Sequence, residues 1–216
     1  ALANLTMGQR DALLLLLREQ TFGPTLDSVA SCPRCQEQLE FSLNTQEIRV
    51  IDVSDDDVPD DAIPNGLSHA QHQYDIEEIT LQFRLPSSVD VAAVTLMAQP
   101  EQVRVYLARR CLLTASRNGN GVAIEQLGVD AIATFADHLA QVDPQAESLL
   151  NLQCPACQHD WQLVFDIVSY LWTALVGYAK RLLIDVHQLA RAYGWSEADI
   201  LAMSNNRRQY YFEWVT

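Results

Sequence analysis

Four cysteines stand in two short stretches whose residue types and spacing could bind a metal ion. The stretches are Cys32-Pro33-Arg34-Cys35-Gln36 and Cys154-Pro155-Ala156-Cys157-Gln158, so both follow the pattern C-P-x-C-Q. Two thiolates at C-x-x-C spacing can bind one metal ion from a tight turn. Two such turns complete a tetrahedral set of four sulfurs, which suits Zn2+. The sequence therefore predicts a zinc site whose ligands are Cys32, Cys35, Cys154 and Cys157.

Both cysteine pairs are followed by apolar residues at every second position. Leu39, Phe41 and Leu43 follow the first pair, and Trp161, Leu163 and Phe165 follow the second. Such alternation is typical of a half-buried β-strand. Two matched pairs with matched strands predict a zinc-ribbon-like β element. Its halves, at about residues 29–43 and 149–165, would be split by a long insertion.

Structural zinc is favoured over two other uses of these cysteines. Catalytic zinc usually has three protein ligands and an open position, whereas four cysteines close the site. A redox C-x-x-C is expected at a helix N-terminus, whereas both pairs here lead into strands. His159 follows Cys157 by two residues and is expected to support the site by hydrogen bonding. Thiol redox chemistry and iron remain alternatives, and the sequence leaves open whether both pairs bind one ion.

No recognisable catalytic motif accompanies the cysteines. The chain contains no G-x-S-x-G, no phosphate-binding loop and no H-E-x-x-H. We therefore predict that the protein is not an enzyme.

The charge distribution argues against a nucleic-acid partner. The net charge is −14, and residues 40–78 hold eleven acidic residues against one basic residue, Arg49. Nucleic-acid binding needs a basic surface to displace counterions, and this chain offers none. Proline, glycine and aspartates between about residues 54 and 72 predict a solvated acidic loop. The spacing of its aspartates does not match a calcium-binding loop.

Apolar runs and cysteine content indicate a compartment. The apolar runs are too short to span a bilayer and no signal segment is recognised, which predicts no membrane association. Four reduced metal-binding thiols suit a cytoplasmic location in the producing cell. The fifth cysteine, Cys111, lies in a helical pattern and is expected to be buried as a small apolar residue.

The remaining pattern predicts an α+β fold with a mostly helical body. At 216 residues and 49% hydrophobic residues, the chain can form one domain over residues 1–216. Strands are expected at 38–43, 48–53 and 79–85, and the insertion at about 79–143 is expected to be mostly helical. The predicted helices are 9–20, about 88–98, 100–115 and 130–141, a long helix after Asp166 that ends at Gly194, and two short helices before the C-terminus, which together make residues 166–216 helical.

Aromatic and basic residues gather near the C-terminus. Aromatic side chains with arginine are enriched in protein interfaces, so these residues are candidates for partner binding. Packing against the long helix as part of a core is an equally good interpretation of the same residues. The candidates are Trp195, Arg207, Arg208, Tyr210, Tyr211 and Trp214.

Several stretches resemble one family over nearly the whole chain. They are Phe22-Gly23-Pro24 with the first cysteine pair, Phe83-Arg84-Leu85-Pro86, Asp143-Pro144-Gln145-Ala146, the second pair with Trp161, the stretch from His187 to Glu197, and Arg207-Arg208-Gln209-Tyr210-Tyr211. In these stretches the chain resembles the T4-like baseplate hub assembly proteins, which are encoded by contractile-tail phages and by extracellular contractile injection systems. The acidic loop is the least matched part. The cysteines are found in a subset of the family.

The resemblance implies a non-enzymatic assembly factor, or chaperone. It would hold hub or wedge proteins of the baseplate until they join, and would be absent from the finished particle. A permanent structural baseplate subunit and a C-x-x-C redox protein are the alternatives. A fixed copy number in purified particles would indicate the structural subunit. Reversible oxidation of Cys32 and Cys35 without bound zinc would indicate the redox protein.

Overall fold

The computed structural model describes residues 2–50 and 71–214 and confirms the α+β prediction. By its internal contacts the chain divides into two compact units, Ala1–Ile167 and Val168–Thr216. The single domain over the whole chain stays a prediction. Within the described ranges, the first unit contains three small antiparallel sheets and most of the helices, and the second is helical.

Helix α1 (Met7–Phe22) opens the first unit after a 3-10 turn at Leu2–Asn4. Its start is fixed by a capping box, since Thr6 Oγ1 accepts from the N–H of Gln9 and Gln9 Oε1 accepts from the N–H of Thr6. Gly23, at φ 88°, ends the helix in a conformation that favours glycine. The helix predicted at residues 9–20 is thereby confirmed.

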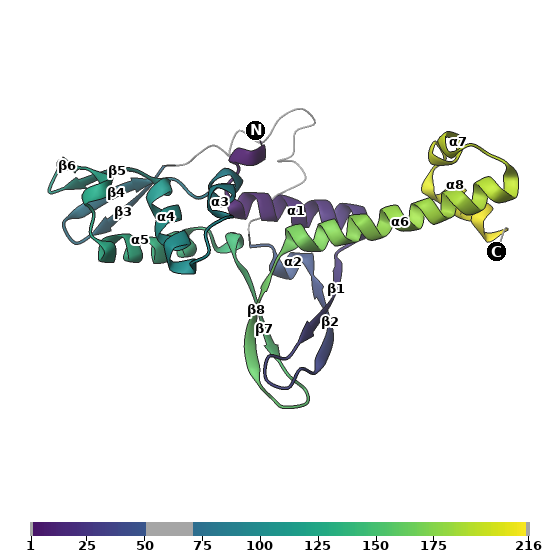
Figure 1. The fold of residues 1–216 in the computed structure, drawn as a ribbon, viewed down its shortest axis with the longest axis horizontal. Helices are drawn as coiled ribbons and strands as arrows, with labels where there is room; N and C mark the ends of the chain where they lie inside the picture. The colour runs from purple at the N-terminus through teal and green to yellow at the C-terminus, as the bar shows by residue number, and fades with distance from the viewer. Residues whose placement is uncertain (1, 51–70, 215–216) are drawn as a thin grey trace. The chain divides into compact units, whose positions relative to one another are not determined.

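Two separate β-hairpins carry the cysteines. The first pairs β1 (Thr25–Ser31) with β2 (Gln38–Asn44), and the second pairs β7 (Ser148–Gln153) with β8 (Asp160–Phe165). Both are antiparallel and two-stranded. Figure 1 shows the two hairpins, far apart in sequence, with their tips close to each other. An isolated two-stranded hairpin is marginally stable in water, so each needs support from outside its own strands.

The insertion between the hairpins forms a four-stranded sheet covered by helices. Phe83 and Phe135 are completely buried and meet edge to face at 5.0 Å, and Cys111 lies in the same core, completely buried as predicted. Figure 1 shows α4 and α5 running beside this sheet. The elements are β3 (His72–Ile76), β4 (Ile79–Phe83), α3 (Ser88–Val94), α4 (Pro100–Cys111), β5 (Leu112–Arg117), β6 (Asn120–Val122), a 3-10 turn at Ile124–Gln126 and α5 (Val129–Val142).

Three predictions for this region need correction or lie outside the structure. The helix predicted at 100–115 ends at Cys111, because the following residues pair with β4, Ala115 opposite Leu81. Ile48 ends a short helix, α2 (Thr45–Ile48), and does not begin a strand, while residues 51–53 lie outside the described residues. The predicted acidic loop at 54–72 also lies outside them, except for its last two residues, of which His72 begins β3.

A buried carboxylate joins α3 to α4 and to the residue that follows β4. Asp90, 1% exposed, accepts from Arg84 Nη1 at 2.6 Å, Arg84 Nη2 at 2.9 Å and Arg110 Nε at 3.0 Å. It also accepts from the N–H of Ser87 at 2.9 Å, which makes the predicted capping box. The bonds from Arg84 and Ser87 hold the pKa of Asp90 well below its usual range, against the effect of burial.

A second buried polar joint ties α1 to the turn before β7. Asp143, 5% exposed, accepts from the N–H of Gly8 at 2.9 Å, and burial raises the pKa of this carboxyl. In the adjoining 3-10 turn (Pro144–Ala146), the completely buried Gln145 accepts from the N–H of Val50 at 2.6 Å. These contacts fix the start of the second hairpin relative to the segment that follows the first.

The second unit is built on α6 (Ile167–Tyr193), which begins at the last residue of the first unit. Gly194 ends α6 at φ 70°, as predicted. Two short helices follow, α7 (Glu197–Leu201) and α8 (Asn205–Glu213), capped by Ser196 and Ser204. A small core of Val186, Leu189 and Ile200 joins α6 to α7, and Tyr211 and Phe212 of α8 pack against it.

Among the described residues, α6 is one helix that could cross a membrane by length and composition alone. The prediction from apolar run length overlooked it, because Lys180, Arg181 and Asp185 interrupt the apolar sequence. A single such helix is weak evidence of a membrane span, since the core helix of a soluble protein can pass the same test.

Candidate metal centre

Each cysteine pair lies in a tight turn at the tip of its hairpin, and the two turns have the same backbone geometry. In the first, the N–H of Gln36 donates to the carbonyl of Cys32 at 2.9 Å, and the N–H of Cys32 donates to the carbonyl of Glu37 at 2.8 Å. The second repeats this pattern: Gln158 donates to Cys154 at 2.8 Å and Cys154 donates to His159 at 2.9 Å. The shared sequence pattern therefore folds into one repeated structure.

A glutamine in each turn adopts an unusual backbone conformation. Gln36 and Gln158 have φ of 63° and 54°, in the left-handed region that glycine usually occupies. A left-handed residue other than glycine costs on the order of 1–2 kcal/mol. The same conformation in both turns indicates that each is held by its surroundings, and a bound metal would do this.

The four sulfur atoms come together in one cluster. Cys35 Sγ lies 3.5 Å from Cys154 Sγ and Cys32 Sγ lies 3.7 Å from Cys157 Sγ, and all four lie within 4.8 Å of one another. A tetrahedral zinc with Zn–S bonds of about 2.3 Å has sulfur–sulfur edges of about 3.8 Å. All five cysteines of the chain are free thiols. The cluster thus has the size of a tetrahedral metal site.

The environment of the sulfurs also suits a bound cation. Burial disfavours a thiolate at Cys32, but hydrogen bonds from the backbone of Cys35 and Arg34, together with those from the thiols of Cys157 and Cys35, lower the pKa of Cys32 to about 7. The backbone of Glu37 lowers the pKa of Cys35, yet its contacts with Cys157, burial and the remaining thiols raise it to about 12. Four thiolates this close repel one another. A divalent cation between them would favour the ionised form of all four.

The cluster is unequally exposed. Cys32 and Cys154 are completely buried, Cys157 is half-buried and Cys35 is exposed. His159 supports the site through its backbone, as its carbonyl accepts from Cys154, while its ring stacks on Trp161 with centroids 6.3 Å apart. The carbonyl of Glu37 has the same place in the first turn, so a supporting role for the His159 side chain stays a prediction.

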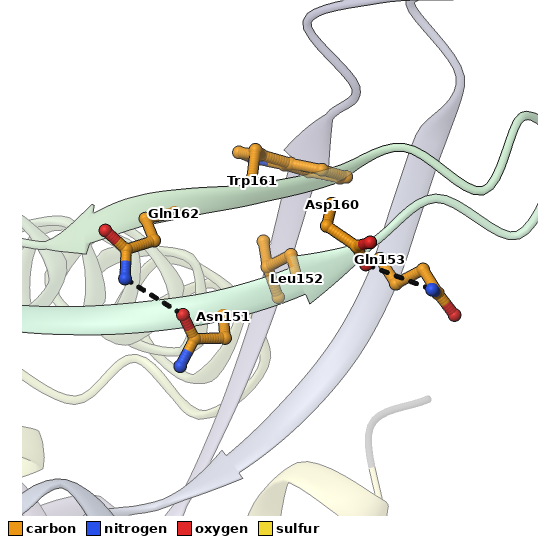
Figure 2. A pocket seen from close by; sticks show the side chains of 6 residues that line it. All are labelled: Asn151, Leu152, Gln153, Asp160, Trp161 and Gln162. Carbon is orange, nitrogen blue, oxygen red and sulfur yellow. Dashed lines mark hydrogen bonds between the residues drawn. The ribbon is translucent and has the colours of Figure 1, made fainter.

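The second hairpin has a hollow of about 540 Å³ along its two strands, drawn in Figure 2. Two side-chain pairs bridge the strands there: Gln162 Nε2 donates to Asn151 Oδ1 at 3.1 Å, and Gln153 Nε2 donates to Asp160 Oδ1 at 3.0 Å. Leu152 and Trp161 are opposite each other in the register. These cross-strand contacts favour a single register of the hairpin, which places its cysteines correctly.

The candidate partner-binding residues near the C-terminus divide into two groups. Arg207, Tyr210, Tyr211 and Trp214 line a common hollow with Tyr193. Arg208 is 5% exposed, and its Nη2 donates to Asn205 Oδ1 at 3.1 Å. Trp195 packs against the small core of the second unit. Tyr193, which the sequence analysis did not select, reaches the hollow because α6 ends there.

The chain is similar over most of its length to one protein family. The sequence model of the family described as "T4 bacteriophage base plate protein" matches residues 1–172. No curated protein and no solved structure matches the chain. The matched range contains both hairpins and all four clustered cysteines, and it ends before α7 and α8.

Proposed function

Because the chain belongs to the T4 bacteriophage base plate protein family, we propose that it is a non-enzymatic assembly factor for the baseplate hub of a contractile phage tail or injection system. Its partners are hub or wedge proteins of the same particle, which it holds in the producing cell's cytoplasm until they join. The family match over residues 1–172 is the observation that carries this proposal.

The four-cysteine cluster has a structural part in this proposal. Zinc is the proposed ion, bound by Cys32, Cys35, Cys154 and Cys157, because a closed set of four thiolates suits it best. A closed set leaves no position for a substrate, which supports a structural role over a catalytic one. The ion would join the tips of two hairpins that are marginal alone.

Metal analysis tests this part. The purified protein is expected to hold about one zinc per chain by elemental mass spectrometry, and a cobalt-substituted sample should show thiolate-to-metal absorption bands. Iron in place of zinc, or no metal with reversible formation of a disulfide between Cys32 and Cys35, would favour the iron and redox alternatives. Insulin reduction provides the activity control for the redox case.

Affinity capture with quantitative mass spectrometry tests the assembly role. The tagged protein is recovered from lysate of producing cells and is also quantified in purified mature particles. Enrichment of hub or wedge proteins from lysate, together with its absence from particles, is the expected result. The proposal is refuted if the tagged protein recovers no baseplate protein from lysate and is also absent from mature particles.

A permanent structural subunit is the second candidate. The family description itself names a base plate protein, which fits a component as well as an assembly factor. A constant copy number per mature particle, in proportion to other baseplate proteins, would select this candidate. The same experiment therefore separates the two.

A further inference from the structure

The second unit has a hollow of about 560 Å³ lined almost entirely by aromatic rings. Tyr193 contributes from the end of α6, and Arg207, Tyr210, Tyr211 and Trp214 contribute from α8 and its end. The latter four stand at i, i+3, i+4 and i+7, so they share one face of the helix. All of these residues belong to the second unit, and the hollow is complete within it.

The floor of the hollow is preformed. Tyr193 stacks on Trp195 with centroids 4.5 Å apart, and both rings meet Tyr211 edge-on, at 5.8 and 4.8 Å. The hydroxyl of Tyr193 also donates to the carbonyl of Tyr211 at 3.4 Å. Trp195 and Tyr211 in turn pack on the core formed around Leu189. A floor held in this way loses little conformational entropy when a ligand binds.

The rim is exposed and aromatic. Tyr210 is 66% exposed and Trp214 is 84% exposed. Exposed tryptophan and tyrosine beside a preformed hollow are typical of residues that dominate the binding energy of protein interfaces. They offer a large apolar area with few rotatable bonds.

The rim also carries one cation without a carboxylate partner. Arg207 is exposed and lies over the ring of Tyr211, with Cζ 5.8 Å from the ring centroid and Nη2 3.5 Å from the Tyr211 hydroxyl. Among the described residues it forms no ion pair. This guanidinium is therefore available to a carboxylate of a partner, in the bidentate geometry that arginine prefers.

We propose that this hollow binds a peptide segment of another protein in which a carboxylate side chain is next to a large apolar side chain. The apolar side chain lies between Tyr210 and Trp214, and the carboxylate pairs with Arg207. A single arginine gives no basic groove of the kind that single-stranded nucleic acid requires. The assignment of this segment to a baseplate protein rests on the proposed function, whereas the chemistry of the site is independent of it.

Peptide binding tests the proposal directly. The full-length, zinc-loaded protein is titrated by fluorescence polarisation against two sets of labelled 15-residue peptides. One set has random sequences and tests the site, and the other overlaps along the baseplate proteins of the same genome and tests the origin of the segment. Bound peptides are expected to share an Asp or Glu next to Phe, Trp, Leu or Met. Replacing that acid by its amide should weaken binding at least tenfold.

Matched variants locate the site. Arg207→Gln and Trp214→Ala should each weaken binding at least tenfold, whereas Arg191→Gln and Trp172→Ala, also exposed residues of this unit outside the hollow, should change it less than twofold. Far-ultraviolet circular dichroism and thermal unfolding show whether each variant is folded. Equal effects of Arg207→Gln and Arg191→Gln, bound peptides without an acid, or no bound peptide would each overturn the proposal.

Two controls exclude other occupants. Sedimentation of the wild type and Trp214→Ala over a range of concentrations tests for a second copy, and a labelled single-stranded oligonucleotide tests for nucleic acid. Self-association that Trp214→Ala abolishes, or oligonucleotide binding that Arg207→Gln abolishes, would overturn the peptide proposal. If instead acidic peptides bind as expected but lysate and particle data exclude a baseplate role, only the proposed function fails.

Discussion

Replacing Cys154 by serine measures how far the fold depends on the four-cysteine cluster. Cys154 is completely buried, and its Sγ lies 3.5 Å from that of Cys35, 119 residues away in the sequence. A cross-link that closes a loop of 119 residues lowers the entropy of the unfolded chain by an amount worth about 5 kcal/mol at 25 °C. A metal that is released on unfolding contributes its binding free energy instead, on the order of ten kcal/mol in small zinc domains.

We therefore expect Cys154→Ser to lower the free energy of unfolding by at least about 5 kcal/mol. Since typical domains are stable by about 5–15 kcal/mol, the variant should be partly unfolded at 25 °C. Urea unfolding followed by tryptophan fluorescence and circular dichroism gives the free energy, and elemental mass spectrometry gives the zinc content. A chelator should destabilise the wild type strongly and leave Cys154→Ser almost unchanged.

Cys111→Ala is the matched control. Cys111 is also completely buried, but it lies in the core of the four-stranded sheet and outside the cluster. Its replacement removes one sulfur from that core, which should cost about 1 kcal/mol and leave the zinc content unchanged. The reasoning is refuted if Cys154→Ser retains zinc, or if the chelator destabilises both variants equally.

Three further substitutions test the polar joints of the first unit. Gly8→Ala should destabilise by about 2 kcal/mol, because a Cβ at Gly8 would overlap Oδ1 of Asp143. Its control is Gly177→Ala in α6, where a Cβ would meet only the end of the Arg181 side chain at an ordinary 3.6 Å; this change should stabilise by about 0.5–1 kcal/mol in the same urea experiment. Asp143→Asn keeps an acceptor for the Gly8 N–H and removes a carboxylate whose pKa is raised by burial. The variant should therefore be more stable than the wild type at pH 7, by an amount that shrinks as the pH falls towards 4. A gain in stability that is independent of pH would contradict this. Asp90→Asn should have the opposite effect and destabilise by about 3 kcal/mol at neutral pH. The lowered pKa of Asp90 contributes stability that is complete above the unfolded pKa of about 4 and is lost as the pH falls below it, so the deficit of the variant should fade in acid. A deficit that does not change with pH would exclude ionisation of Asp90 as its cause.

Much of the local structure could be predicted from residue patterns. Alternating apolar residues located β2, β4 and β8, and caps or glycines located the ends of α1, α3 and α6. These signals depend on neighbours a few residues away, where backbone geometry and side-chain periodicity decide the outcome. For the same reason the repeated C-P-x-C-Q pattern indicated two equal turns.

The strands β5 and β6 could not be recognised in this way. Leu112, Leu113 and Ala115 continue the apolar pattern of the preceding helix, so the sequence predicted a helix as far as Ala115. What ends the helix is the pairing of Ala115 with Leu81, a residue far away in the sequence. Local propensity was overridden by a non-local ladder of hydrogen bonds.

The metal centre and the aromatic hollow show the same division. By itself the sequence determined which atoms are available: four thiols in two matched turns, and an arginine with aromatic residues near the C-terminus. Only the tertiary structure brought all four sulfurs within 4.8 Å of one another. It also separated two adjacent arginines, leaving Arg207 at the rim of the hollow and burying Arg208. Successive residues on a helix point about 100° apart, so packing decides which side chain meets solvent and which meets the core.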